Sequence, residues 1–258
     1  MRKLLLMVLV LGSVPVMAQS AFDGTWRVDP SSAQFKGGDK FLLQNGVWHC
    51  DSCVPKVSIK ADGKEHKVTT SPYYDAATVN EVNDHTVEIK SKKNGKPSGT
   101  NKMTVSDDGK TLTTEWSFVS ESGQSGNGKY TSERVGEAPA GVNKVSGTWQ
   151  PNKVEDASES VSVISYKVNG DEFSMSDKTG DSYTAKLDGK DYPYKGDPGL
   201  TSVSLKKIDA NTIEETDKRK GKPIYVSRMT VSADGKTMQI DNEDKLHNTG
   251  QKWTAQKQ

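Results

Sequence analysis

The chain is poor in the residues that build most disulfide scaffolds, metal centres and large aromatic cores. Its 258 residues include only two cysteines and four histidines, and aromatic residues make up 7%. Two cysteines exclude a disulfide-dense scaffold of the kind that stabilises small secreted domains. The sequence also lacks a G-x-S-x-G elbow, an H-E-x-x-H helix and a complete P-loop. No familiar catalytic class is therefore indicated, and no cofactor is expected.

An excess of charge of one sign is also missing. Lysine and arginine number 35 and the acids 34, which gives a formal net charge of +1. Because nucleic-acid binding proteins need a concentrated basic surface, this balance excludes nucleic acid as a partner. Hydrophobic residues, at 32%, are also fewer than usual for a globular chain.

The one long apolar run lies at the start, in MRKLLLMVLVLGSVPVMA. Arg2 and Lys3 precede the run, and Val16-Met17-Ala18 provides the small residues of a signal peptidase site. We expect residues 1–18 to be a signal peptide, no membrane span after its removal, and a periplasmic or secreted protein.

The rest of the chain repeats itself. Residues 85–111 align without gaps on residues 211–237, with about half of the positions identical. Near the start of each unit, FDGTW (22–26) matches VSGTW (145–149). The sequence predicts two similar domains, 19–135 and 145–258, joined by a Gly-, Ala- and Pro-rich linker at 136–144. One larger barrel built from two halves is the alternative.

The local hydrophobic period is two, which is typical of strands. Leu112, Thr114, Trp116 and Phe118 share one face, and the residues between them are polar. Asn-Gly and Asp-Gly pairs suited to tight hairpins recur along both units. We predict an all-β protein of two tandem antiparallel up-and-down barrels, each with about eight strands.

The Gly-Thr-Trp that opens each unit resembles the first strand of lipocalins and related calycin barrels. The resemblance implies that Trp26 and Trp149 close the ends of the barrels and contribute to ligand binding. The family's later arginine has a possible counterpart in Arg134, and Lys257 takes that place in the second unit. The strings TVSxDGKT and AKLDGKDYP resemble a group of exported bacterial proteins of unknown function, and that resemblance implies no activity.

Both cysteines lie in NGVWHCDSCVP (45–55). In an exported protein, Cys50 and Cys53 are expected to form a disulfide. Two alternatives stay open: a redox pair, and a metal site made by His49, Cys50, Cys53 and His66.

Tyrosines recur at equivalent places after a D-G-K turn in each unit. They are Tyr73 and Tyr74 in SPYYD, and Tyr192 and Tyr194 in DYPYKGDP. Such loops can form binding lips at a barrel mouth or simply cover its end. We expect a non-enzymatic protein that binds a small apolar ligand or an envelope protein. The alternatives are a barrel-cavity isomerase, cyclase or hydrolase, and a metal or thiol protein using the Cys50/Cys53 pair.

Overall fold

The computed structural model describes residues 20–120 and 122–258, and it confirms the all-β prediction. Strands alternate with tight turns over this whole region, and its one α-helix, α1 (Glu159–Ser162), has four residues. The expected signal peptide lies outside the described residues. Among the residues described, no helix combines the length and apolar character needed to cross a membrane.

One ten-stranded antiparallel sheet, here called the first barrel, is continuous in sequence. Its edge strands, β4 and β5, follow each other in the chain and are separated only by Ala61. Its strands are β2 (Asp39–Gln44), β3 (Val47–Cys50), β4 (Val57–Lys60), β5 (Asp62–Lys67), β6 (Ala76–Asn83), β7 (Thr86–Lys93), β8 (Lys96–Val105), β9 (Thr111–Val119), β10 (Ser125–Val135) and β11 (Gly147–Ala157).

The second sheet, here called the second barrel, is a closed barrel of ten strands. It combines the first strand of the chain with the last nine. Its strands are β1 (Gly24–Lys36), β12 (Val163–Asn169), β13 (Glu172–Asp177), β14 (Ser182–Lys186), β15 (Asp188–Lys195), β16 (Ser202–Lys207), β17 (Thr212–Arg219), β18 (Lys222–Val231), β19 (Thr237–Asp244) and β20 (Thr249–Lys257).

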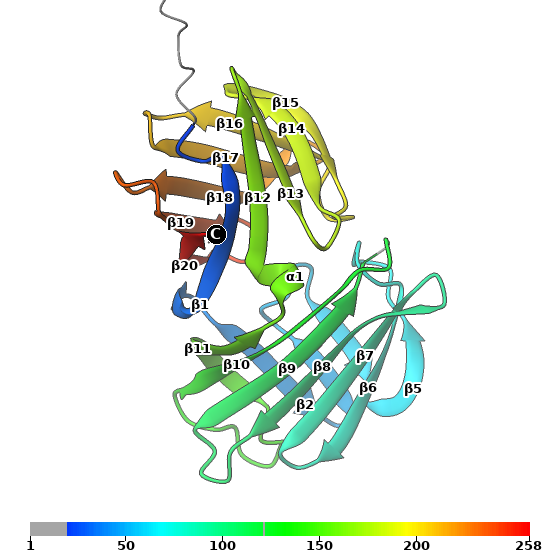
Figure 1. Ribbon diagram of the computed structural model, residues 1–258. Helices are drawn as coiled ribbons and strands as arrows, with labels where there is room; N and C mark the ends of the chain where they lie inside the picture. The colour runs from blue at the N-terminus through cyan, green and yellow to red at the C-terminus, as the bar shows by residue number, and fades with distance from the viewer. Residues whose placement is uncertain (1–19, 121) are drawn as a thin grey trace, which may run out of the picture.

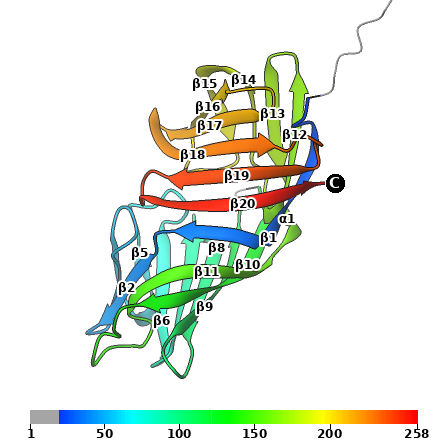
Figure 2. The ribbon, with the colours of Figure 1, turned by 90° about the vertical axis from the view of Figure 1, so that its left-hand side faces the viewer.

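The N-terminal strand β1 closes the second barrel. It pairs with β12 on one side and with β20 on the other, although the whole first barrel separates it from both in sequence. Figure 1 shows β1 beside β12 in the upper barrel, and Figure 2 shows it beside β20. The first barrel is thus inserted between two strands of the second.

This arrangement differs from the predicted division into 19–135 and 145–258, because the opening strand of each repeat lies in the barrel of the other. The predicted linker, 136–144, is part of the connection between β10 and β11, which pair side by side in the first barrel. Strands joined by a short connection usually pair with each other. The chain passes between the barrels at Gly37-Gly38 and at α1 instead. A Cβ at Gly38 would lie 2.2 Å from the carbonyl oxygen of Trp149, so this crossing requires glycine.

The two tryptophans of the Gly-Thr-Trp motifs are buried in equivalent ways, one in each barrel. Trp26 and Trp149 are both 0% exposed. The indole Nε1 of Trp26 donates to the carbonyl of Phe22, and that of Trp149 donates to the carbonyl of Val145, both at 2.8 Å. Each ring packs in the core of its barrel.

A cation from the other repeat covers each indole. The Arg134 guanidinium lies 4.0 Å from the Trp149 ring centre. It donates to the carbonyls of Gly109 at 2.6 Å, Ser146 at 2.8 Å and Lys144 at 2.6 Å. Arg134 therefore ties a hairpin and the β10–β11 connection to the end of the first barrel.

Lys257 has the equivalent place in the second barrel, where its Nζ lies 5.2 Å from the Trp26 ring. Its ammonium donates one hydrogen bond, to the Ala21 carbonyl at 3.3 Å. The longer distance and the single bond make this contact the weaker of the two.

The repeat provides a matched test of these contacts. We expect Arg134→Ala to lower the free energy of unfolding by about 2 kcal/mol or more, because it removes several charge-assisted hydrogen bonds and a cation–π contact. Lys257→Ala should lower it by about 1 kcal/mol or less. Urea unfolding of both variants measures the difference, and an equal or larger loss for Lys257→Ala would contradict this account.

Candidate functional site

A cavity of about 620 Å³ lies where the two barrels meet. Its walls combine apolar side chains with a few acids and tyrosines. The second barrel contributes the larger part, and the first barrel contributes Asp39, Trp116, Tyr130, Pro151, Val154 and Ala157. The crossing of the chain between the barrels thus places residues of the first barrel against the second.

Aromatic side chains from both barrels line this cavity. Phe35 on β1 and Trp253 on β20 pack edge to face, with ring centres 5.9 Å apart. Trp116 lies over β10, where a Cβ at Gly128 would come within 2.6 Å of its ring. The glycine therefore leaves the space that this indole occupies.

Two carboxylic acids on β17 point into the second barrel. Ile213, Glu215 and Asp217 alternate along the strand and share its buried face. Glu215 and Asp217 are each 8% exposed, which is unusual for acids because burial disfavours their charge. The Tyr183 hydroxyl on β14 donates to Glu215 Oε2.

Burial raises the pKa of both acids. For Asp217 the causes are burial first and then the nearby charge of Glu215, and together they raise its pKa to about 9. Burial also raises the pKa of Glu215, although its hydrogen bond with Tyr183 opposes the shift. The pair therefore retains at least one proton at neutral pH.

The phenols around this pair are also neutral. Burial and the charge of Glu215 raise the pKa values of Tyr166 and Tyr183 well above the ordinary tyrosine value. Both rings pack on Phe173, with centre distances of 5.2 Å for Tyr166 and 6.4 Å for Tyr183. The inner face of the second barrel thus offers acid groups held by an aromatic cluster.

The tyrosines predicted from sequence have different surroundings. Tyr194 lines the cavity at the barrel junction and packs 5.7 Å from Tyr183. Tyr192, on the same strand, donates at 3.1 Å to Asp188 in an exposed position. Trp26 and Trp149 do not line this cavity, because each is fully buried in the core of its barrel.

Tyr73 and Tyr74 line a separate, larger cavity of about 810 Å³ that also includes loops of the second barrel. The Tyr73 hydroxyl donates at 3.5 Å to Asp197. The ring also packs against Gly199, where a Cβ would lie 2.1 Å from the hydroxyl oxygen. Tyr73 thus connects the two barrels, whereas Tyr74 packs against the first core.

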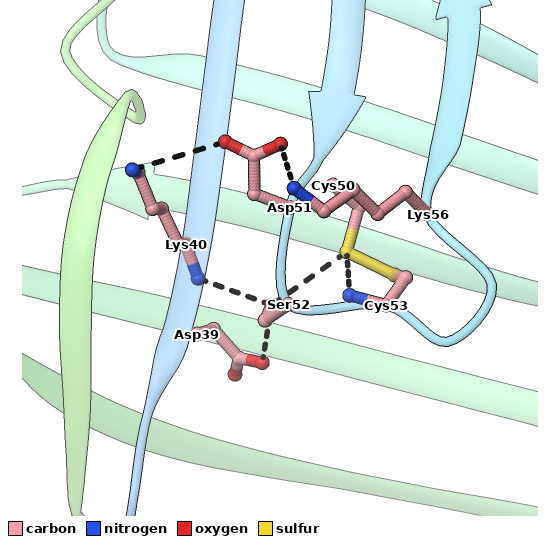
Figure 3. Close-up of a disulfide and its surroundings, with 7 residues drawn as sticks. All are labelled: Asp39, Lys40, Cys50, Asp51, Ser52, Cys53 and Lys56. Atoms are coloured by element: carbon pink, nitrogen blue, oxygen red, sulfur yellow. Dashed lines mark hydrogen bonds and ion pairs between the residues drawn. A yellow bond between two sulfur atoms is a disulfide. The ribbon is translucent and has the colours of Figure 1, made fainter. Parts of the chain in front are cut away.

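Cys50 and Cys53 form a disulfide, as predicted, with an S–S distance of 2.06 Å. Figure 3 shows Ser52, between them, donating at 3.2 Å to Asp39, while the Lys40 amide donates at 3.1 Å to Ser52. Since Asp39 lines the cavity at the barrel junction, the disulfide loop holds part of its wall. Burial raises the pKa of Asp39.

The structure does not bring together the four residues of the metal alternative. Trp48 and Cys50 face inward, and His49 pairs with Ser58 on the next strand at 2.8 Å. His66 pairs instead with Asp62, at 2.8 Å. In residues 20–120 and 122–258, no group of three histidines, cysteines or acids is placed to hold a metal ion.

Sequence reasoning missed Glu215 and Asp217, although the repeat contained a signal for them. In the alignment, Glu215 falls on Ile89 and Asp217 on Ser91. Ile213 is apolar and lies on the same face as the two acids, which marks that face as the inward one. On this face the second unit has acids where the first unit has an isoleucine and a serine.

The acid pair predicts a dependence of stability on pH. The folded-state pKa of Asp217, about 9, lies above its unfolded value of about 3.9, so the protonated acid stabilises the fold at low pH. This contribution is lost as the pH rises toward 9. We expect Asp217→Asn to reduce the loss of stability between about pH 5 and about pH 9, as measured by urea unfolding.

Glu214→Gln is the control, because Glu214 lies on the same strand and alternates with the inward acids. It makes the same replacement of a carboxyl by an amide on the other face of the strand, so the pH dependence should stay that of the wild type. A wild-type stability that rises across this range, or equal curves for wild type and Asp217→Asn, would contradict the assignment.

The disulfide should have a modest effect on stability, because the two cysteines that it joins are separated by only 3 positions in the sequence. The double variant Cys50→Ser/Cys53→Ser should lose about 2 kcal/mol by the loop-entropy relation and should still fold. Thermal or urea unfolding with and without reductant measures this loss. A reduced wild type that matches the oxidised protein in stability would rule out such a role.

In comparisons with known proteins, no family model and no curated protein matches this chain. The interpretation of the site therefore depends on its own geometry.

Proposed function

We propose that the protein is an exported, lipocalin-like binding protein that holds a small, mostly apolar molecule in the cavity at the barrel junction. The observation that carries this proposal is the cavity itself. Its volume of about 620 Å³ is within the range of small-molecule sites, which are typically apolar with a few convergent polar groups. Apolar residues such as Met229 and Ile240 line it together with the acids and tyrosines.

The two barrels differ in the polar groups that their inner faces contribute to this cavity. The Trp149 end of the first barrel is filled by residues such as Leu112, Val105 and Val145. The second barrel also has a filled core around Trp26, but the carboxyl groups of Glu215 and Asp217 line the cavity. A binding protein needs such orienting polar groups inside an otherwise apolar site.

Export is supported by the sequence of residues 1–18 and by the disulfide. Disulfides persist mainly in oxidising compartments such as the periplasm or the extracellular space. The lipocalin-like part of the proposal is supported by the equivalent burial of Trp26 and Trp149, each under a cation.

One observation favours an enzyme as a second candidate. The barrel-cavity alternative requires acids and tyrosines that converge inside one barrel, and Glu215, Asp217 and Tyr183 do so. A carboxylic acid that retains its proton at neutral pH can serve as a general acid. Binding remains the leading proposal, because it requires only the cavity and its polar groups.

Filling the cavity should abolish binding of an apolar probe. Val154→Trp places an indole in the cavity wall, whereas Val82→Trp adds the same side chain at a valine that is 51% exposed. We expect wild type and Val82→Trp to enhance the fluorescence of N-phenyl-1-naphthylamine equally, and Val154→Trp to weaken its binding by about tenfold or more.

Circular dichroism should confirm that both variants fold. If wild type does not bind the probe, or Val154→Trp binds it as well as Val82→Trp does, the proposed site is wrong.

A further inference from the structure

We propose that the preferred ligand of this cavity is a small apolar amine in its protonated form, with its ammonium group against Asp217 and Glu215. This inference rests on the proposed function and specifies its ligand class. It follows from the charges of the cavity wall, an unpaired buried oxygen and the surrounding aromatic rings.

The charged groups of the wall have a single sign. Among the described residues that line the cavity are four acids, Asp39, Asp177, Glu215 and Asp217, and none of the lining residues is lysine, arginine or histidine. An anionic ligand would meet only acids and neutral groups there. A cationic ligand would supply the opposite charge that stabilises a buried acid in its ionised form.

Three of these acids accept hydrogen bonds from neutral donors of the protein. Asp177 accepts four hydrogen bonds from residues 179–181. Asp39 accepts from Ser52, and Glu215 accepts from Tyr183.

Asp217 shares a hydrogen bond with Glu215, but it has further capacity to accept. Within the described part of the chain, its buried Oδ1 accepts from no other donor of the protein, and the residue is 8% exposed. An unpaired buried acceptor is costly, and native proteins usually satisfy it. An ammonium donates three hydrogen bonds and accepts none, so it matches this oxygen and the adjacent Glu215.

Aromatic and apolar groups complete the site. Tyr166 and Tyr194 line the same cavity as the two acids, and aromatic rings favour nearby cations. Phe35 and Trp253 provide apolar surface for the rest of the ligand. The site thus matches a molecule with a cationic end and an apolar body.

Binding of a cation should displace the proton that the acid pair holds. An opposite charge next to an acid favours its ionised form, so the proton leaves to solvent as the ammonium enters. The charges of Glu215, Asp181 and Asp197 act on Asp217, and the phenols of Tyr166, Tyr183, Tyr194 and Tyr225 lie near it. The cation of this cluster is Arg219, which acts on Asp197 and Tyr225, donates to the Gly199 carbonyl and does not line the cavity.

Three ligands with alkyl chains of similar length and polar groups of different charge test the inference: octylamine, octan-1-ol and octanoate. Each is titrated against the intact protein carrying bound N-phenyl-1-naphthylamine. We expect octylamine to displace the probe at concentrations about tenfold or more below those of octan-1-ol, with octanoate the weakest, because a buried ionic hydrogen bond contributes at least this factor.

Asp217→Asn should remove the preference for octylamine and leave octan-1-ol within about twofold, because the amide retains the size but not the charge. Glu214→Gln, on the same strand, should retain the preference. Calorimetry in buffers of different ionisation enthalpy should show proton release when octylamine binds to wild type, and less release for Asp217→Asn.

The outcomes separate this inference from the proposed function. If wild type binds the probe but octylamine and octan-1-ol displace it equally, or if Asp217→Asn retains the preference, the amine inference is wrong and the binding site stands. If wild type does not bind the probe, or none of the three ligands displaces it, the proposed function itself fails.

Discussion

The pairing of β1 with both β12 and β20 is the constraint on which the rest of the structure depends. Without β1, the second barrel would have two unpaired edges, which folded sheets generally avoid. Because β1 comes first in the chain and its partners come late, the whole first barrel lies between them in sequence. The chain must then cross at Gly37-Gly38 and at α1, and these crossings place Trp116 and Tyr130 against the cavity of the second barrel.

The cavity combines two conditions that oppose each other. Its walls offer apolar surface to a ligand, but burial also raises the pKa values of Glu215 and Asp217 and leaves one Asp217 oxygen unpaired. Proteins retain such a group when it has a role that outweighs its effect on stability. The proposed amine would provide both the opposite charge and the missing hydrogen bonds.

Much of the fold could be predicted from local patterns. The alternation of Leu112, Thr114, Trp116 and Phe118 indicated strands, and the repeat indicated two barrels. The partners of β1 and β11, which open the two repeats, could not be predicted, because a short Gly- and Pro-rich segment such as 136–144 can separate domains or connect a hairpin. The acid pair was missed because charged residues usually face solvent. The sequence signal for the acid pair was the alignment of Glu215 with Ile89, because an apolar residue at the equivalent position of the first repeat indicates an inward-facing side chain.

The most direct test of the account is the ionisation state of Asp217, observed by NMR through the carbon-13 shift of its side-chain carboxyl. In the free protein at neutral pH, the account predicts the shift of a protonated or proton-sharing acid. After octylamine is added, the shift should move to that of an ionised carboxylate. An Asp217 that is already ionised in the free protein, or whose shift does not respond to the amine, would contradict the central claim.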